Sequence, residues 1–107
     1  MSKETVLEAV SRLYQEFVKL PFPRRLAGAD RAGFDLVMLD SDTAGWIFIW
    51  VENGGRLDAG GQSGLLRCIA RLDRVIPVVS EADDPEYWHR LHEMARLVAD
   101  SPHVATK

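Results

Sequence analysis

A segment near the carboxyl end of the chain carries the side chains best suited to hold a metal ion. Glu86 and His89 are three residues apart, as are His89 and His92, and Glu93 follows directly. Residues three apart share one face of a helix, so carboxylate and imidazole groups at this spacing can bind one zinc or iron ion. A di-iron bundle needs a second Glu-x-x-His pair, and zinc proteases use a different order, His-Glu-x-x-His. We therefore keep Glu86, His89, His92 and Glu93 as an alternative metal or small-ligand site, and expect ordinary surface histidines and no cofactor.

Two aspartates, Asp40 and Asp42, follow the apolar run of residues 36–39. An apolar run that ends in Asp-x-Asp is similar to the first motif of haloacid-dehalogenase-type phosphatases. This resemblance implies a nucleophilic aspartate, a second aspartate acting as acid and base, and a bound magnesium ion, all on a doubly wound sheet. The chain is too short for that sheet, and Thr43 comes one residue earlier than the threonine of the motif. We interpret Asp40 and Asp42 as residues that cap or solvate a turn or helix start.

Two other features of the sequence, its glycine-rich segment and its cysteine, favour a structural role over a catalytic one. Glycines at 54–55 and 60–64 lie in turns before a helix, where backbone N–H groups can bind phosphate, but the lysine of a P-loop is missing. The single cysteine, Cys68, excludes an internal disulfide and falls near the apolar edge of a helix. We expect a small buried thiol there and no enzyme active site in the chain.

The aromatic residues of the middle of the chain point to an interface. Trp46, Phe48 and Trp50 are a heavy aromatic load for 107 residues. In a helix, Trp46 and Trp50 share one face and Phe48 lies on another, so one helix of a bundle cannot hide them all equally well. They can all belong to the core, or part of the segment can be a contact surface. Our leading hypothesis is a non-enzymatic interaction module that forms a homodimer or docks on a protein partner through residues 43–53.

Three segments that surround these residues show the periodicity of amphipathic helices. The first has Ser2 as its candidate N-cap and stops at Pro21, the second runs from a cap at Asp58 to Pro77, and the third begins at Asp84. The apolar residues that we expect to be buried are Val6, Val10, Leu13, Phe17 and Leu20 in the first, Leu65, Leu66, Ile69, Leu72, Val75 and Ile76 in the second, and Trp88, Leu91, Met94 or Ala95, and Val98 in the third.

The segment from Phe34 to Asn53 allows two interpretations. Its β-branched and aromatic residues favour two strands, which gives the alternative of an α+β fold with a hairpin at residues 34–51 and a homodimer that completes a four-stranded sheet. An isolated hairpin that is apolar on both faces is marginally stable, and Asn53-Gly54-Gly55 is a typical helix stop. We therefore predict a helix here, and an all-α fold with a compact bundle of four main helices.

Length and charge set the remaining expectations. A chain of 107 residues with 47% hydrophobic residues can build one core, so we expect a single domain over residues 1–107. The net charge of −3, with only one adjacent arginine pair, at 24–25, excludes a general nucleic-acid binder. No apolar run is long enough to cross a membrane, and no signal peptide is visible at the start. These features favour a cytoplasmic protein, and the excess of arginine over lysine favours a bacterial source.

Overall fold

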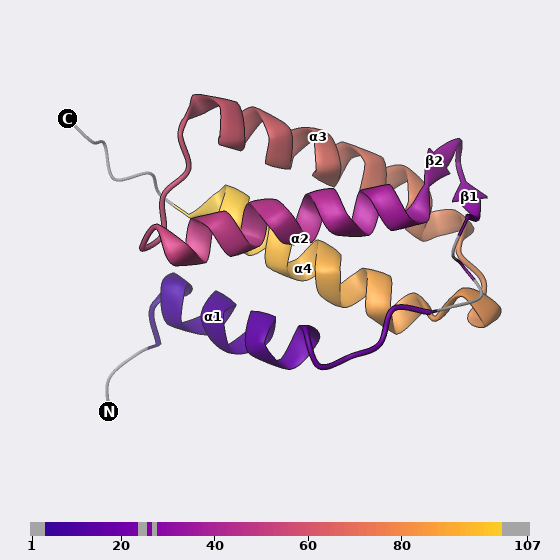
Figure 1. The fold of residues 1–107 in the computed structure, drawn as a ribbon, viewed down its shortest axis with the longest axis horizontal. Coiled ribbons are helices and arrows are strands. Elements are labelled where there is room, and N and C mark those ends of the chain that lie inside the picture. Colours follow the sequence, from indigo (N-terminus) through magenta and orange to yellow (C-terminus); the bar gives the residue numbers. More distant parts are fainter. Residues whose placement is uncertain (1–3, 24–25, 27, 102–107) are drawn as a thin grey trace.

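Four α-helices make up most of the computed structural model, which describes residues 4–23, 26 and 28–101. They are α1 (Val6–Phe17), α2 (Leu36–Glu52), α3 (Ala59–Val75) and α4 (Pro85–Asp100). Strands β1 (Asp30–Arg31) and β2 (Phe34–Asp35) form a short antiparallel hairpin before α2. The 3-10 turns η2 (Ile76–Val78) and η3 (Glu81–Asp83) join α3 to α4. The predicted bundle of four main helices is confirmed (Figure 1).

The core of the bundle lies around α4, which packs against each of the other three helices. Helix α2 runs between α1 and α3 in the view of Figure 1, and one of its sides rests on α4. The predicted buried face of α4 is confirmed, since Trp88, Leu91, Ala95 and Val98 are almost completely shielded from solvent. Burial of this apolar surface is the main force that holds the helices together.

The segment with two interpretations is one helix of 17 residues, so the alternative hairpin at residues 34–51 is wrong. The side chain of Asp35 caps the helix by accepting a hydrogen bond of 2.9 Å from the Met38 N–H. At the other end Asn53 is the C-cap, and Gly54 follows with a φ of +70°, as the glycine stop predicted. Burial against α3 and α4 outweighs the strand preference of its β-branched and aromatic residues.

A hairpin does exist, but it lies before this helix. Asp30 pairs with Asp35 and Arg31 with Phe34, across a two-residue turn. Both turn residues, Ala32 and Gly33, have positive φ angles of 53° and 85°, as in a type I′ turn. Alanine is a rare choice for that conformation, so the turn gives little signal in the sequence.

Several helix boundaries and buried faces differ from the predictions. Helix α1 is capped by Thr5, whose side chain and that of Glu8 form a reciprocal capping box, whereas the predicted cap Ser2 lies outside the described residues. Asp58 caps α3 as predicted, but Asp84 only occupies the cap position of α4 and makes no capping bond with its side chain. Three residues that were predicted to be buried are exposed: Leu66 by 57%, Leu20 by 38% and Val6 by 37%. Helix α1 ends at Phe17, before the predicted stop at Pro21.

An ion pair ties the hairpin to the turn before α4. The guanidinium of Arg31 donates two hydrogen bonds of 2.9 Å to the two carboxylate oxygens of Asp83, which is 4% exposed. The Ser80 N–H donates a further bond of 3.0 Å to the same carboxylate. These donors favour the charged form and lower the pKa of Asp83 to about 2.

Candidate functional site

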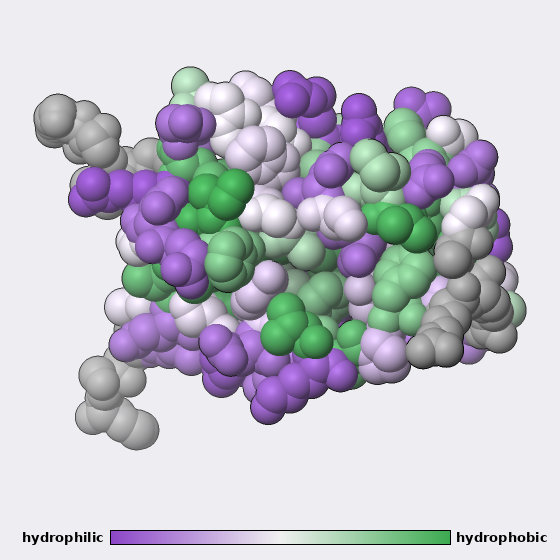
Figure 2. Space-filling view, in the orientation of Figure 1, coloured by the Kyte–Doolittle hydropathy of each residue, from purple (hydrophilic) through white to green (hydrophobic). Residues whose placement is uncertain are grey.

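Helix α2 is apolar on two opposite sides, which sets it apart from the other helices of the bundle. Its inward side, made of Leu36, Leu39, Thr43, Ile47 and Trp50, is buried against the core. The opposite side is the outward face of α2, which we define as the residues Val37, Met38, Ser41, Gly45, Phe48, Ile49 and Glu52. In the middle of the view in Figure 2, where Figure 1 places α2, apolar side chains interrupt the polar surface.

No helix in the described part of the chain is long and apolar enough to span a membrane.

The three predicted interface residues have three different environments. Phe48 is 46% exposed on the outward face, with its ring 6.0 Å from that of Tyr14 on α1. Trp46 is partly buried against α3. Trp50 is 2% exposed, so placing it on a contact surface was wrong. Trp50 shares a helix side with Thr43 and Ile47, and the indole of Trp46 turns instead toward α3.

The exposed apolar side chains lie on both flanks of the outward face. Met38 is 58% exposed, and Val37 and Ile49 are each exposed by more than a third. Two small residues one helical turn apart, Ser41 and Gly45, lie between these flanks. The result is an apolar surface with a shallow centre, on which another helix can rest closely.

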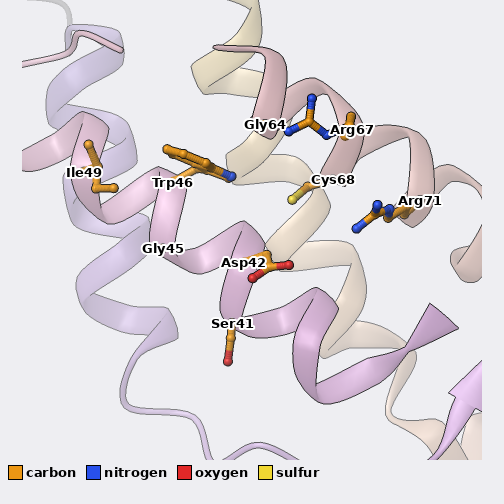
Figure 3. A pocket seen from close by; sticks show the side chains of 9 residues that line it. All are labelled: Ser41, Asp42, Gly45, Trp46, Ile49, Gly64, Arg67, Cys68 and Arg71. Atoms are coloured by element: carbon orange, nitrogen blue, oxygen red, sulfur yellow. The ribbon is translucent and has the colours of Figure 1, made fainter. Parts of the chain in front are cut away.

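A pocket of about 450 Å³ opens beside this face, between α2 and α3. From α2 it is lined by Ser41, Asp42, Gly45, Trp46 and Ile49, and from α3 by Gly64, Arg67, Cys68 and Arg71. Figure 3 shows the two arginine side chains, the Asp42 carboxylate and the Cys68 sulfur arranged around the opening, with the Trp46 ring at one end.

The pocket owes its shape to one close approach of helices. A Cβ atom added to Gly64 would lie only 2.6 Å from two ring carbons of Trp46, so only glycine leaves room for the indole at this position. The predicted burial of Cys68 is confirmed, since it is 3% exposed. Burial also raises the pKa of its thiol, which keeps the thiol itself uncharged near neutral pH.

The histidine segment on α4 does not assemble a metal site. Glu86 accepts a hydrogen bond of 3.0 Å from Arg90, and His92 lies 2.8 Å from the Asp73 carboxylate on α3. His89 is exposed. Among the residues that the structure describes, no three histidine, cysteine, aspartate or glutamate side chains lie close enough to hold a metal ion together. The alternative set of Glu86, His89, His92 and Glu93 therefore gains no support from the structure.

The two aspartates that resembled a phosphatase motif lie inside a helix and not at the end of a strand. Helix α2 begins at Leu36, so Asp40 and Asp42 are in its second turn and cap neither a turn nor a helix start, contrary to the prediction. Asp40 accepts a hydrogen bond of 2.7 Å from the Tyr87 hydroxyl on α4. Burial raises the pKa of Asp40 and this hydrogen bond opposes the rise, while burial and the carboxylate raise the pKa of Tyr87. This pair fixes the packing of α2 on α4.

Only part of the predicted glycine turns exists: Gly54 and Gly55 follow α2 with positive φ angles, whereas the glycines of residues 60–64 lie inside α3. The Asp58 carboxylate accepts a hydrogen bond of 2.7 Å from the Gly61 N–H, which occupies a donor that a phosphate would need.

Comparison with known proteins adds no family to these observations. The chain matches no protein-family model, no curated protein and no solved structure.

The sequence analysis missed the arginines of the pocket. Arg67 and Arg71 are one helical turn apart, which puts both on one side of α3. Both lie outside the apolar stripe of that helix, so its periodicity gives them no role. The signal that could have found the pocket is Gly64, a glycine inside a helix, because such glycines mark close approaches.

Proposed function

We propose that the protein is a self-associating interaction module in which the outward face of α2 packs against the same face of a second copy. The observation that carries the proposal is that α2 is apolar on the side that faces solvent as well as on the side that faces the core. Exposed apolar groups gathered on one helix face are typical of protein contact surfaces.

Gly45 supports a close contact at the centre of this face. A Cβ atom added to Gly45 would meet nothing within 4 Å, so no packing among the described residues requires glycine there. A glycine inside a helix costs about 1 kcal/mol relative to alanine. A helix backbone that approaches from outside gives a reason for this cost, because small residues allow two helices to pack closely.

The charges at the ends of the outward face favour a second copy as the occupant. Glu52 lies at its carboxyl end. At its amino end, the guanidinium groups of Arg71 and Arg74 lie over the Phe34 ring, 5.6 and 5.7 Å from its centre. Antiparallel packing about a two-fold axis puts the glutamate of each copy near the arginines of the other. Such a contact is self-complementary, as a two-fold interface has to be.

The experiment is sedimentation-equilibrium centrifugation of the full chain and of two charge variants. We expect wild-type protein to approach twice the chain mass of 12.0 kDa as its concentration rises. Met38→Glu should dissociate it, because the variant puts a charge into the apolar contact and, in the antiparallel arrangement, close to Glu52 of the second copy. Leu66→Glu is the matched control, since Leu66 is equally exposed but lies on α3 beside the carboxyl end of α4.

Circular dichroism should show unchanged helix content in both variants, because both side chains are exposed. The proposal fails if wild-type protein stays at the mass of one chain at every concentration. It also fails if Leu66→Glu dissociates the dimer as completely as Met38→Glu does. A monomer that binds a different protein through Met38 and Phe48 would assign the face to another partner.

A further inference from the structure

We propose that the pocket between α2 and α3 binds a small aromatic anion, with its acid group held by Arg67 and Arg71 and its ring against Trp46. The volume of about 450 Å³ is within the range of small-ligand sites and is ample for an aromatic ring with a carboxylate or phosphate group.

The positive charge of the pocket comes from two adjacent side chains. Arg67 and Arg71 are one turn apart on α3, so their two cationic groups are neighbours on the same side of the helix. Neither forms an ion pair with a carboxylate in the part of the chain that the structure describes. Two planar guanidinium groups that line one opening suit a carboxylate or a phosphate, because each can donate two parallel hydrogen bonds.

The remaining lining suits the aromatic part of such a ligand. Figure 3 shows the Trp46 ring at the end of the pocket nearest Gly64, with its indole nitrogen on the side of the arginines and Cys68. Ile49 and Gly45 add apolar surface from α2. A neutral thiol at Cys68 does not repel an anion, whereas a thiolate would.

The carboxylate of Asp42 should repel a bound anion, which provides the sharpest test of the proposed site. Its carboxylate faces the same opening as the two arginines. It therefore lowers the positive potential without filling the pocket. Removal of its charge should strengthen anion binding, and removal of either arginine should weaken it. A surface with no binding site predicts no saturable binding for these substitutions to change, and it predicts that loss of the nearby Arg74 weakens anion attraction as well.

The experiment is a titration of the full chain followed by nuclear magnetic resonance of the tryptophan indole N–H groups. The probes are benzoate and phenyl phosphate, with uncharged benzamide as their control. We expect saturable shifts of the Trp46 signal with both anions and none with benzamide, while the buried Trp50 and Trp88 signals stay in place. The anion that binds with the higher affinity identifies the acid group that the site prefers.

Three variants and one control complete the design. Arg67→Gln and Arg71→Gln should each weaken binding about tenfold, which is the range for a hydrogen bond to a charged group. Asp42→Asn should tighten binding about threefold, as expected for removal of one partly solvated charge. Arg74→Gln should leave the affinity unchanged, because Arg74 is on the same helix and over the Phe34 ring but does not line the pocket.

The proposed pocket and the proposed self-association share Ser41, Gly45, Ile49 and Arg71, so a second copy can compete with the ligand. The titration is therefore repeated in Met38→Glu, which changes a residue outside the pocket and is expected to be a monomer. Absence of saturable Trp46 shifts in both backgrounds overturns the proposal, as does equal binding of benzamide. It is also overturned if Asp42→Asn and Arg67→Gln change the affinity in the same direction.

Discussion

Two glycines in neighbouring helices should respond in opposite ways to the same substitution. Gly45 and Gly64 both lie inside helices and both line the pocket. By helix propensity alone, alanine at either position should stabilise the fold by about 1 kcal/mol. The structure separates the two, because only the Cβ at position 64 meets other atoms at close distance.

The expected sizes follow from these distances. At Gly45 nothing lies within 4 Å of the added Cβ, so Gly45→Ala should keep most of the gain, about 0.5–1 kcal/mol. At Gly64 the Cβ would lie 2.6 Å from Cε2 and Cζ2 of Trp46, whereas carbon atoms pack best at about 3.5–4.0 Å. Overpacking of this kind costs about 1–3 kcal/mol, so Gly64→Ala should be destabilising in spite of its propensity gain.

The measurement is thermal and urea unfolding of both variants in the Met38→Glu background. That background separates the stability of one chain from any contribution of self-association, which would make the melting temperature depend on concentration. In a chain of this size, 1 kcal/mol corresponds to a shift of about 4 °C. We expect Gly45→Ala to melt a few degrees above its parent and Gly64→Ala to melt a few degrees below it.

A double-mutant cycle shows whether the indole is the cause. Trp46→Leu removes the ring atoms that the new Cβ would meet, so Gly64→Ala should become stabilising by about 1 kcal/mol in that variant. A Gly64→Ala protein that melts above its parent would refute the helix packing described here. Additive effects of Gly64→Ala and Trp46→Leu would refute the role of the indole in it.

Two partly buried polar contacts, Arg31 with Asp83 and Tyr87 with Asp40, give the remaining predictions. The lowered pKa of Asp83 means that its contribution to stability is present above the ordinary value of 3.8 and is lost as the pH falls toward about 2, so acid titration of unfolding should show a smaller loss in Arg31→Gln than in wild type. The raised pKa of Asp40 has the opposite effect on stability. Its protonated carboxyl group favours the folded state, and this contribution is lost as the pH rises and the group ionises. Tyr87→Phe removes the only side-chain donor to this half-buried group among the described residues and should cost about 1–3 kcal/mol at neutral pH, with a smaller cost in acid, as measured by urea unfolding.

The helical elements could be predicted because their signals are local. The apolar period of α4 and the cap at Asp58 depend on neighbours three or four residues away, and both appear in the structure. The same reasoning failed where contacts between helices decide which side chains are buried. Leu66 has the right spacing for the buried stripe of α3, but α2 and α4 cover the other sides of that helix, so Leu66 remains exposed.

The candidate site was only partly visible for the same reason. Residues 43–53 were correctly assigned to a helix with more apolar surface than one core can cover, but period alone could not show which tryptophan faces inward. The pocket joins Trp46 and Asp42 of α2 to Arg67 and Arg71 of α3. Spacing along the sequence cannot show that these two segments meet, because their contact depends on the register in which the two helices pack. Gly64 indicates a close approach to α3, but the sequence does not say that the indole of Trp46 is the group that lies against it.

The outward face of α2 and the pocket beside it are linked by that register. The glycine at position 64 lets the Trp46 ring rest on α3, and the ring then forms one end of the pocket. With Trp46 turned aside, the centre of the outward face is left to the small residues Ser41 and Gly45. A larger residue at position 64 would push the indole outward, reduce the pocket and cover part of the shallow centre. One close helix contact therefore shapes both surfaces, so a substitution at Gly64 should impair anion binding and self-association together, whereas Met38→Glu should impair self-association alone.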